Sequence, residues 1–119
     1  MPRILIVDDE PLITMMVEEW LGELACETVG PAHSVSRALE LIGSGQLDAA
    51  ILDVSLGSEK SYPIADALRA RKIPFALATG HSAEDVENRF NDVPILTKPF
   101  DFDAVRSIIG SLTKRDARL

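Results

Sequence analysis

The sequence predicts an α/β domain in which a parallel five-stranded sheet carries helices on both faces. Three observations support this fold class. Short apolar runs alternate five times with amphipathic segments of helical length, as in repeated β-α units with right-handed crossovers. The runs over 3–7 and 48–53 are almost continuously apolar, which is typical of strands covered on both faces. The length of 119 residues suits one domain with its own core.

The first strand is expected over 3–7 and is followed by a helix over 11–24. This helix carries an apolar stripe with i, i+4 spacing, which we expect to face the core. Its members are Leu12, Met16, Trp20 and Leu24, and Met15 is also expected to pack in the core.

The second and third strands are expected over 27–32 and 48–53. Between them Ser34 is a good N-cap for a helix that runs to about Ile42. Glycines at 43 and 45 are expected to end this helix.

The second half of the chain continues the alternation after a loop over 54–63. Pro63 suits the first turn of a helix that reaches about Arg71. Ser82 and Asp85 have capping-box spacing for a short helix, and Asp101 is expected to cap the final helix. The remaining elements are strands over 74–79 and 93–97 and helices over 83–90 and from 102 to about 112, the last with an apolar face of Val105, Ile108, Ile109 and Leu112.

The composition restricts the function and the setting. The net charge is −7, which argues against binding of duplex nucleic acid. No apolar run approaches the roughly 20 residues of a membrane span, and no secretory signal is visible. Cys26 is the only cysteine and is expected to be a packing residue, which fits a reducing cytoplasm. We expect one domain over 1–113 and a short basic tail over 114–119.

Reactive or charged side chains follow four of the five expected strands. The first strand ends at Asp8 and Asp9, the third at Asp53, the fourth at Thr79 and the fifth at Lys98. In an open parallel sheet the carboxyl ends of the strands form one edge, where ligands bind. If these strands are neighbours, three carboxylates, a hydroxyl and an ammonium group share one pocket.

This combination has a coherent chemistry. Carboxylate oxygens suit Mg²⁺, which often bridges protein carboxylates to phosphate. An aspartate can act as a nucleophile and form an acyl phosphate, while a cation, a lysine and a hydroxyl offset the charge of the transferred group. Taken alone, each residue has a simpler explanation, such as a helix cap for Asp8 and Asp9 or an Asx turn for Asp53. Only their joint position at equivalent strand ends favours a site for Mg²⁺ binding and phosphoryl transfer.

The stretches ILIVDDE, AILDVSLG, ALATG and ILTKPF together resemble the receiver domain of two-component response regulators over about residues 3–113. The resemblance implies a flavodoxin-like (βα)5 fold with strand order 2-1-3-4-5. It also implies that Asp53 accepts a phosphoryl group, that Lys98 pairs with this group and that Thr79 hydrogen-bonds it. The Lys98–Pro99 peptide bond is implied to be cis.

The resemblance further implies a Mg²⁺ site. Asp9 and Asp53 would bind the ion directly, Asp8 through water, and Ser55 through its backbone carbonyl. Ser55 and His81 would border the phosphoryl group and tune its lifetime; an exposed loop residue is an equal alternative for His81.

Two features depart from the common receiver pattern. The family has an aromatic switch residue three positions before the lysine, where this chain has Ile95. The segment after Asp53 and the stretch PFALATGH resemble the "FAT GUY" receivers, with Leu77 in place of Phe and His81 in place of Tyr. That subset is associated with stand-alone receivers in bacterial general stress signalling.

The implied partners are a sensor histidine kinase or histidine phosphotransfer protein and a downstream protein, with no nucleic acid or membrane. The face built from residues 83–112 is expected to report phosphorylation, and a phosphorylation-dependent homodimer is a further expectation. The domain would catalyse only its own phosphorylation and dephosphorylation. No output segment follows the last helix, so the chain is either a stand-alone receiver or part of a longer protein.

Two alternatives remain open from sequence. One is an aspartyl-phosphate enzyme of the haloacid-dehalogenase type, against which stand Glu10 in place of a second aspartate and the absence of a cap domain. The other is a degenerate receiver that binds partners without phosphorylation. Ile95, at the position of the family's aromatic switch residue, leaves this alternative open.

Overall fold

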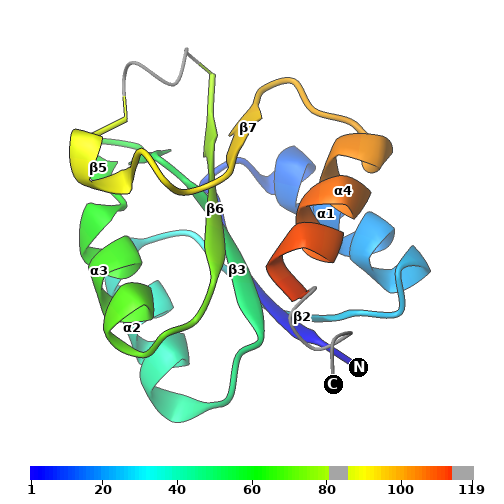
Figure 1. The fold of residues 1–119 in the computed structure, drawn as a ribbon, viewed down its shortest axis with the longest axis horizontal. Helices are drawn as coiled ribbons and strands as arrows, with labels where there is room; N and C mark the ends of the chain where they lie inside the picture. The colour runs from blue at the N-terminus through cyan, green and yellow to red at the C-terminus, as the bar shows by residue number, and fades with distance from the viewer. Residues whose placement is uncertain (81–85, 114–119) are drawn as a thin grey trace.

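The computed structural model describes residues 1–80 and 86–113 and confirms the α/β fold (Figure 1). Its main sheet has five parallel strands in the order β2-β1-β3-β6-β7. Since β6 and β7 are the fourth and fifth strands of this sheet, the expected order 2-1-3-4-5 is confirmed. The strands are β1 (Arg3–Val7), β2 (Glu27–Ala32), β3 (Ala49–Asp53), β6 (Phe75–Thr79) and β7 (Ile95–Thr97).

Two helices cover each face of the sheet (Figure 1). On one face lie α1 (Pro11–Glu23) and α4 (Phe102–Thr113), and on the other lie α2 (Val35–Ser44) and α3 (Tyr62–Ala70). Alternate residues of β1 enter the two cores, with Ile4 and Ile6 facing α1 and α4 and Leu5 and Val7 facing the opposite layer. Burial on both faces explains why the strands are almost continuously apolar.

The expected core face of α1 is wrong in its first half. Thr14, Val17 and Leu21 are buried, whereas Leu12 is 74% exposed, Met15 62% and Met16 39%. A strict i, i+4 series turns by about 40° at each step, so it leaves a flat sheet after two or three members. The observed i, i+3, i+7 pattern stays on one side. Trp20 and Leu24 pack partly against the core, as expected.

Most helix boundaries follow the expected signals. The Ser34 side chain accepts a hydrogen bond from the Arg37 backbone N–H, and Asp101 Oδ1 accepts one from the Ala104 N–H. Pro63 stands in the first turn of α3. α2 continues through Gly43 to Ser44, slightly beyond the expected end.

The short α-helix expected over 83–90 is wrong for the part that the structure describes. Residues 86–90 contain only the 3-10 helix η2 (Asn88–Phe90), because Glu87 is extended with ψ 141° and interrupts helical geometry. The capping residues Ser82 and Asp85 lie outside the described residues.

The segment 54–63, expected to be a loop, contains a two-stranded antiparallel hairpin. Its strands are β4 (Ser55–Leu56) and β5 (Glu59–Lys60), with Ser55 opposite Lys60. Leu56 is buried, and Gly57 has φ +61°, a conformation that glycine adopts without strain. The hairpin therefore forms an ordered link between β3 and α3.

Two expectations on the core and the membrane can also be tested. Cys26 is buried in the core beneath α1 and α4, as expected for a packing residue. Among residues 1–80 and 86–113, none of the helices has the length and apolar character that crossing a bilayer requires.

Candidate functional site

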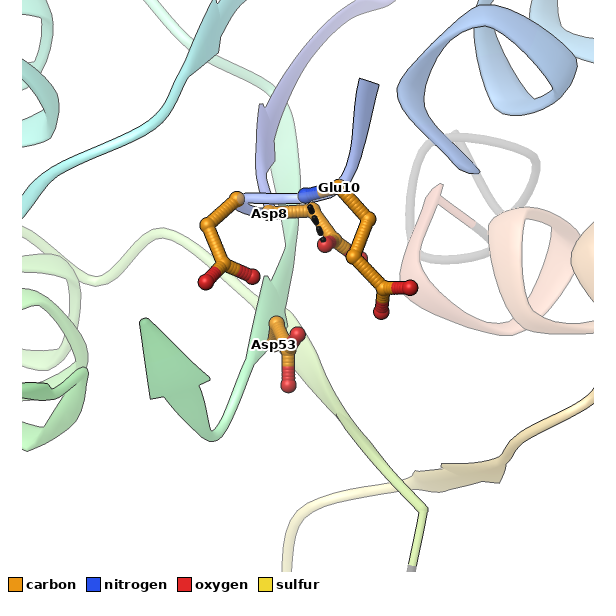
Figure 2. A group of neighbouring side chains, drawn as sticks. Asp8, Glu10 and Asp53 are labelled. Atoms are coloured by element: carbon orange, nitrogen blue, oxygen red, sulfur yellow. Dashed lines mark hydrogen bonds between the residues drawn. The ribbon is translucent and has the colours of Figure 1, made fainter. Parts of the chain in front are cut away.

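Four carboxylates gather where β1 and β3 end. These strands are neighbours, with Val7 beside Leu52, so the residues that follow them lie at one edge of the sheet. Figure 2 shows Asp8 and Glu10 on the segment after β1 and Asp53 at the end of β3. One carboxylate oxygen from each member lies within 4.8 Å of those of all the others, and the members are Asp8, Asp9, Glu10 and Asp53.

Lys98 brings a positive charge into this group from the end of β7. Its Nζ donates hydrogen bonds to Asp53 Oδ2 at 2.9 Å, to Asp8 Oδ2 at 3.0 Å and to Glu10 Oε1 at 3.0 Å. Its backbone N–H donates to the Thr79 carbonyl at 2.8 Å, and the Lys98–Pro99 peptide bond is cis, as expected. One ammonium group is thus shared among three carboxylates.

Burial sets the electrostatics of the pocket. Asp8 is 4% exposed and Asp53 7%. Burial, together with the negative charge of Asp8, raises the pKa of Asp53 above its ordinary value, although the hydrogen bond from Lys98 acts in the opposite direction. Burial disfavours the charged form of Lys98, but its ion pairs with Asp53, Asp8 and Glu10 outweigh this and raise its pKa. The pocket therefore holds excess negative charge that a further cation would relieve.

Backbone groups fix the acidic side chains. The Glu10 N–H donates to Asp8 Oδ1 at 2.9 Å, and the Ser55 N–H donates to Asp53 Oδ1 at 3.2 Å. His33 Nδ1 lies 2.8 Å from the Asp8 carbonyl oxygen. The two N–H contacts hold the carboxylates of Asp8 and Asp53 in defined orientations, and the His33 contact fixes the Asp8 backbone.

Thr79 lies at the same edge as the acids. It is buried at the end of β6, directly after Ala78, which is paired with Asp53 across the β3–β6 ladder. Ile95, where the family has an aromatic, is half-buried at the start of β7 opposite Leu77. His81 lies outside the described residues.

The β4–β5 hairpin borders the pocket. Ser55 begins β4, and its Oγ accepts a hydrogen bond of 3.1 Å from Lys60 Nζ. A Cβ added at Gly57 would lie 3.8 Å from Asp9 Oδ2, so the turn of the hairpin lies against this carboxylate. The structure thus adds Glu10 and Lys60 to the residues expected from sequence. Glu10 could have been found because it directly follows the acidic pair, whereas the position of Lys60 depends on a hairpin that the sequence pattern did not indicate.

The fold and the site define a class: an open parallel α/β domain with a cluster of four carboxylates and a lysine at the carboxyl edge of its sheet. The sequence matches the response regulator receiver domain family over residues 4–110, and the chain belongs to this family. Its fold is that of the receiver domains, which are signalling domains of two-component systems rather than classical enzymes.

Relatives of known structure support this membership. The chain is 50% identical to SdrG from Sphingomonas melonis Fr1, with a TM-score of 0.84 over 94% of this chain and 96% of that one. It is 30% identical to the response regulator TrrA from Thermotoga maritima, solved in complex with Mg²⁺-BeF, with a TM-score of 0.82 over 94% of this chain and 99% of that one.

A curated relative is the transcriptional regulatory protein PdtaR of Mycobacterium tuberculosis, 33% identical over 102 residues. The match covers 82% of this chain and 50% of PdtaR. The chain thus spans about half the length of the curated relatives it matches.

Proposed function

We propose that this chain is a phosphoacceptor receiver in which Asp53 takes a phosphoryl group from a phosphohistidine of a sensor kinase or phosphotransfer protein. The observation that carries the proposal is the contact of a buried Asp53 carboxylate with Lys98, inside a group of four carboxylates. In the transfer, a carboxylate oxygen of Asp53 forms the new bond to phosphorus while the phosphorus–nitrogen bond breaks. The product is an acyl phosphate.

Lys98 and Thr79 would hold the transferred group. Phosphorylation adds about 1.5–2 negative charges and three acceptor oxygens at Asp53. Lys98 already contacts Asp53 and would pair with a phosphoryl oxygen, and Thr79 would donate its hydroxyl proton to another. Ser55 and His81 would tune the lifetime of the acyl phosphate.

The donor set fits Mg²⁺, because four carboxylates with oxygens within 4.8 Å of one another offer the hard ligands that this ion prefers. Asp9 and Asp53 would bind it directly, Asp8 through water and Ser55 through its carbonyl oxygen. The ion would supply the charge that a phosphoryl group needs beside these acids. TrrA, solved with Mg²⁺-BeF, supports this assignment by similarity.

The readout would be a shift between two packings of the face that follows Thr79. Residues 83–112 would form this face, of which η2, β7 and α4 are described. Thr79 leads into the connection from β6 to β7, and Lys98 begins the connection from β7 to α4, so drawing both toward a phosphoryl group favours a different packing there. A downstream protein, or a second copy of the chain, would recognise this packing.

The setting proposed is a cytoplasmic receiver, over residues 1–113, in general stress signalling. Two features support the "FAT GUY" subset: the stretch PFALATGH and the 50% identity to SdrG. Ile95 indicates that any switch here works without an aromatic at that position.

Intact mass measurement tests the proposal. Incubation with a small phosphodonor and Mg²⁺ is expected to add one labile phosphoryl group. The gain should vanish in Asp53→Asn and persist in the matched control Asp103→Asn, which removes an exposed carboxylate on α4. Amide shifts on adding a phosphoryl analogue are expected to reach η2, β7 and α4.

Other outcomes would identify the alternatives. Turnover of many phosphate esters would indicate an aspartyl-phosphate enzyme. Absence of any gain with small donors and with a cognate kinase would indicate a degenerate receiver. Amide shifts confined to the loop around Asp53 would contradict the proposed readout.

A further inference from the structure

The β4–β5 hairpin brings a second lysine to the border of the acidic pocket. Ser55, two residues after Asp53, gives its backbone N–H to Asp53 Oδ1 at 3.2 Å. The hydroxyl of the same residue accepts a hydrogen bond of 3.1 Å from Lys60 Nζ. A continuous chain of contacts therefore joins Lys60 to the proposed phosphoacceptor through one residue.

The hairpin holds Lys60 in register. Ser55 and Lys60 are cross-strand partners, and the Ser61 N–H donates to the Val54 carbonyl at 2.9 Å. The buried side chain of Leu56 anchors the first strand in the core. Because both ends of the hairpin are fixed, the backbone of Lys60 is held opposite Ser55, and its ammonium group lies within reach of the Ser55 hydroxyl.

The contact also orients the Ser55 hydroxyl. When an ammonium group donates to a hydroxyl oxygen, the hydroxyl proton points away from the cation and becomes a stronger donor. The Ser55 N–H donates to Asp53 Oδ1, so the residue that carries this hydroxyl adjoins the carboxylate, and we expect an oxygen added to Asp53 to come within its reach. Lys98, in contrast, is shared among Asp8, Glu10 and Asp53.

A simpler explanation is that Lys60 only protects an edge strand, as surface lysines often do. The geometry indicates a role beyond edge protection, because the Lys60 ammonium group contacts the hydroxyl of Ser55, which lies two residues from Asp53. The new charge of about 1.5–2 units brought by phosphorylation would also fall within reach of this pair.

We propose that Lys60, acting through the Ser55 hydroxyl, is a positioning residue that prolongs the lifetime of the phosphoryl group on Asp53. The inference rests on the proposed function and adds a residue to it. Without Lys60 the Ser55 hydroxyl would rotate freely, and the phosphoryl group would lose one oriented donor.

The test is the decay of the acyl phosphate in the full chain, followed by intact mass after the phosphodonor is removed. Lys60→Gln is expected to speed decay by about three- to tenfold, the effect of one net hydrogen bond. Ser55→Ala should have a similar effect. The double variant should decay no faster than the faster single variant, because both changes remove one interaction. Lys60→Arg should restore slow decay.

Arg71→Gln is the matched control, since it removes an exposed cation at the far end of α3. Decay as in the wild type is expected for it, and both Arg71→Gln and Lys60→Gln should keep the wild-type melting temperature. Unchanged decay in Lys60→Gln, or additive effects in the double variant, would overturn the role of Lys60 but leave the proposed function intact. A wild-type chain that never gains a phosphoryl group would overturn the proposed function, and the inference with it.

Discussion

At the residue scale, the charge balance of the acidic pocket depends on Lys98 and Glu10. Glu10 adds a third carboxylate to the partners of Lys98, yet its own side chain is 60% exposed. Asp9 faces the turn of the β4–β5 hairpin instead. The two acids are adjacent in sequence but differ in surroundings.

This difference predicts unequal effects on Mg²⁺ affinity. Asp9→Asn removes a proposed direct ligand and should weaken binding by more than about tenfold, equivalent to about 1.4 kcal/mol. Glu10→Gln removes a carboxylate that pairs with Lys98 and is not a proposed direct ligand, so its effect should stay below that. Titration calorimetry of the unphosphorylated protein measures both, and equal losses would contradict the assignment of Asp9.

Cys26 allows a prediction on pH. Burial raises the pKa of its thiol, so the neutral form is favoured in the folded state. Because the folded state disfavours the thiolate, the free energy of unfolding is unaffected below the ordinary thiol pKa. It falls as the pH rises from that value through the raised pKa of the folded state. We expect a disulfide reagent at pH 8 to label the native protein far more slowly than the denatured one. Equal rates would show that the thiol is accessible.

Ser61 is an unusual buried polar residue. Its side chain is fully buried, and its Oγ has no hydrogen-bond partner among the described residues. Ser61→Ala removes a desolvated hydroxyl, so we expect the free energy of unfolding to stay equal or to rise by about 1 kcal/mol. Thermal melting checks this, and a clear loss of stability would indicate a partner for the hydroxyl.

The site residues could be predicted only where strand ends determine them. Asp8, Asp53 and Lys98 follow apolar runs, and the carboxyl ends of parallel strands must meet at one edge. The direction of the Glu10 side chain and the Ser55–Lys60 contact depend on packing and on hairpin register, which carry no periodic signal in the sequence.

At the scale of elements, an aromatic cluster joins α3 to the connection between β6 and β7. Tyr62 stacks on Phe90 with ring centres 5.5 Å apart, and Phe75 packs edge-on at 6.1 Å. Two guanidinium groups lie over the Phe90 ring, that of Arg89 at 4.5 Å and that of Arg69 at 5.0 Å. This cluster holds η2 in place although η2 is only one 3-10 turn.

Phe90→Ala should therefore be strongly destabilising. The side chain is fully buried, and its loss leaves a cavity that costs about 3–5 kcal/mol. Urea unfolding measures the change. The matched control Leu39→Ala, at a residue 38% exposed on α2, should cost much less, and equal costs would contradict the role of the cluster.

The strands and caps could be predicted well, because each depends on a few neighbouring residues. The inner face of α1 could not, since an i, i+4 series and an i, i+3, i+7 series coexist there and only the sheet decides between them. The connection over 86–93 has helical apolar spacing at Val86, Phe90 and Val93, but the extended Glu87 interrupts the backbone.

At the scale of the whole molecule, the net charge of −7 and the four clustered acids predict that Mg²⁺ stabilises the fold. At tenfold excess over its Kd the ion should add about 1.4 kcal/mol, or roughly 5 °C in Tm. Differential scanning calorimetry with and without Mg²⁺ measures this shift. Asp9→Asn should abolish most of it, and an unchanged Tm in the wild type would contradict the metal site.

The class of fold follows from alternation alone, but the order of the strands does not. Five β-α units allow several parallel arrangements, and the order 2-1-3-4-5 was expected from the resemblance to receivers. The structure realises it through the pairing of β1 with both β2 and β3.

Because every strand of the main sheet points the same way, Met1 and the start of β1 lie at the end of the molecule opposite Asp53 (Figure 1). Met1 is also 79% exposed. A dye, a bead or a sensor chip joined at the amino terminus would therefore leave the acidic edge facing outward, ready for a kinase in single-molecule or surface-capture work.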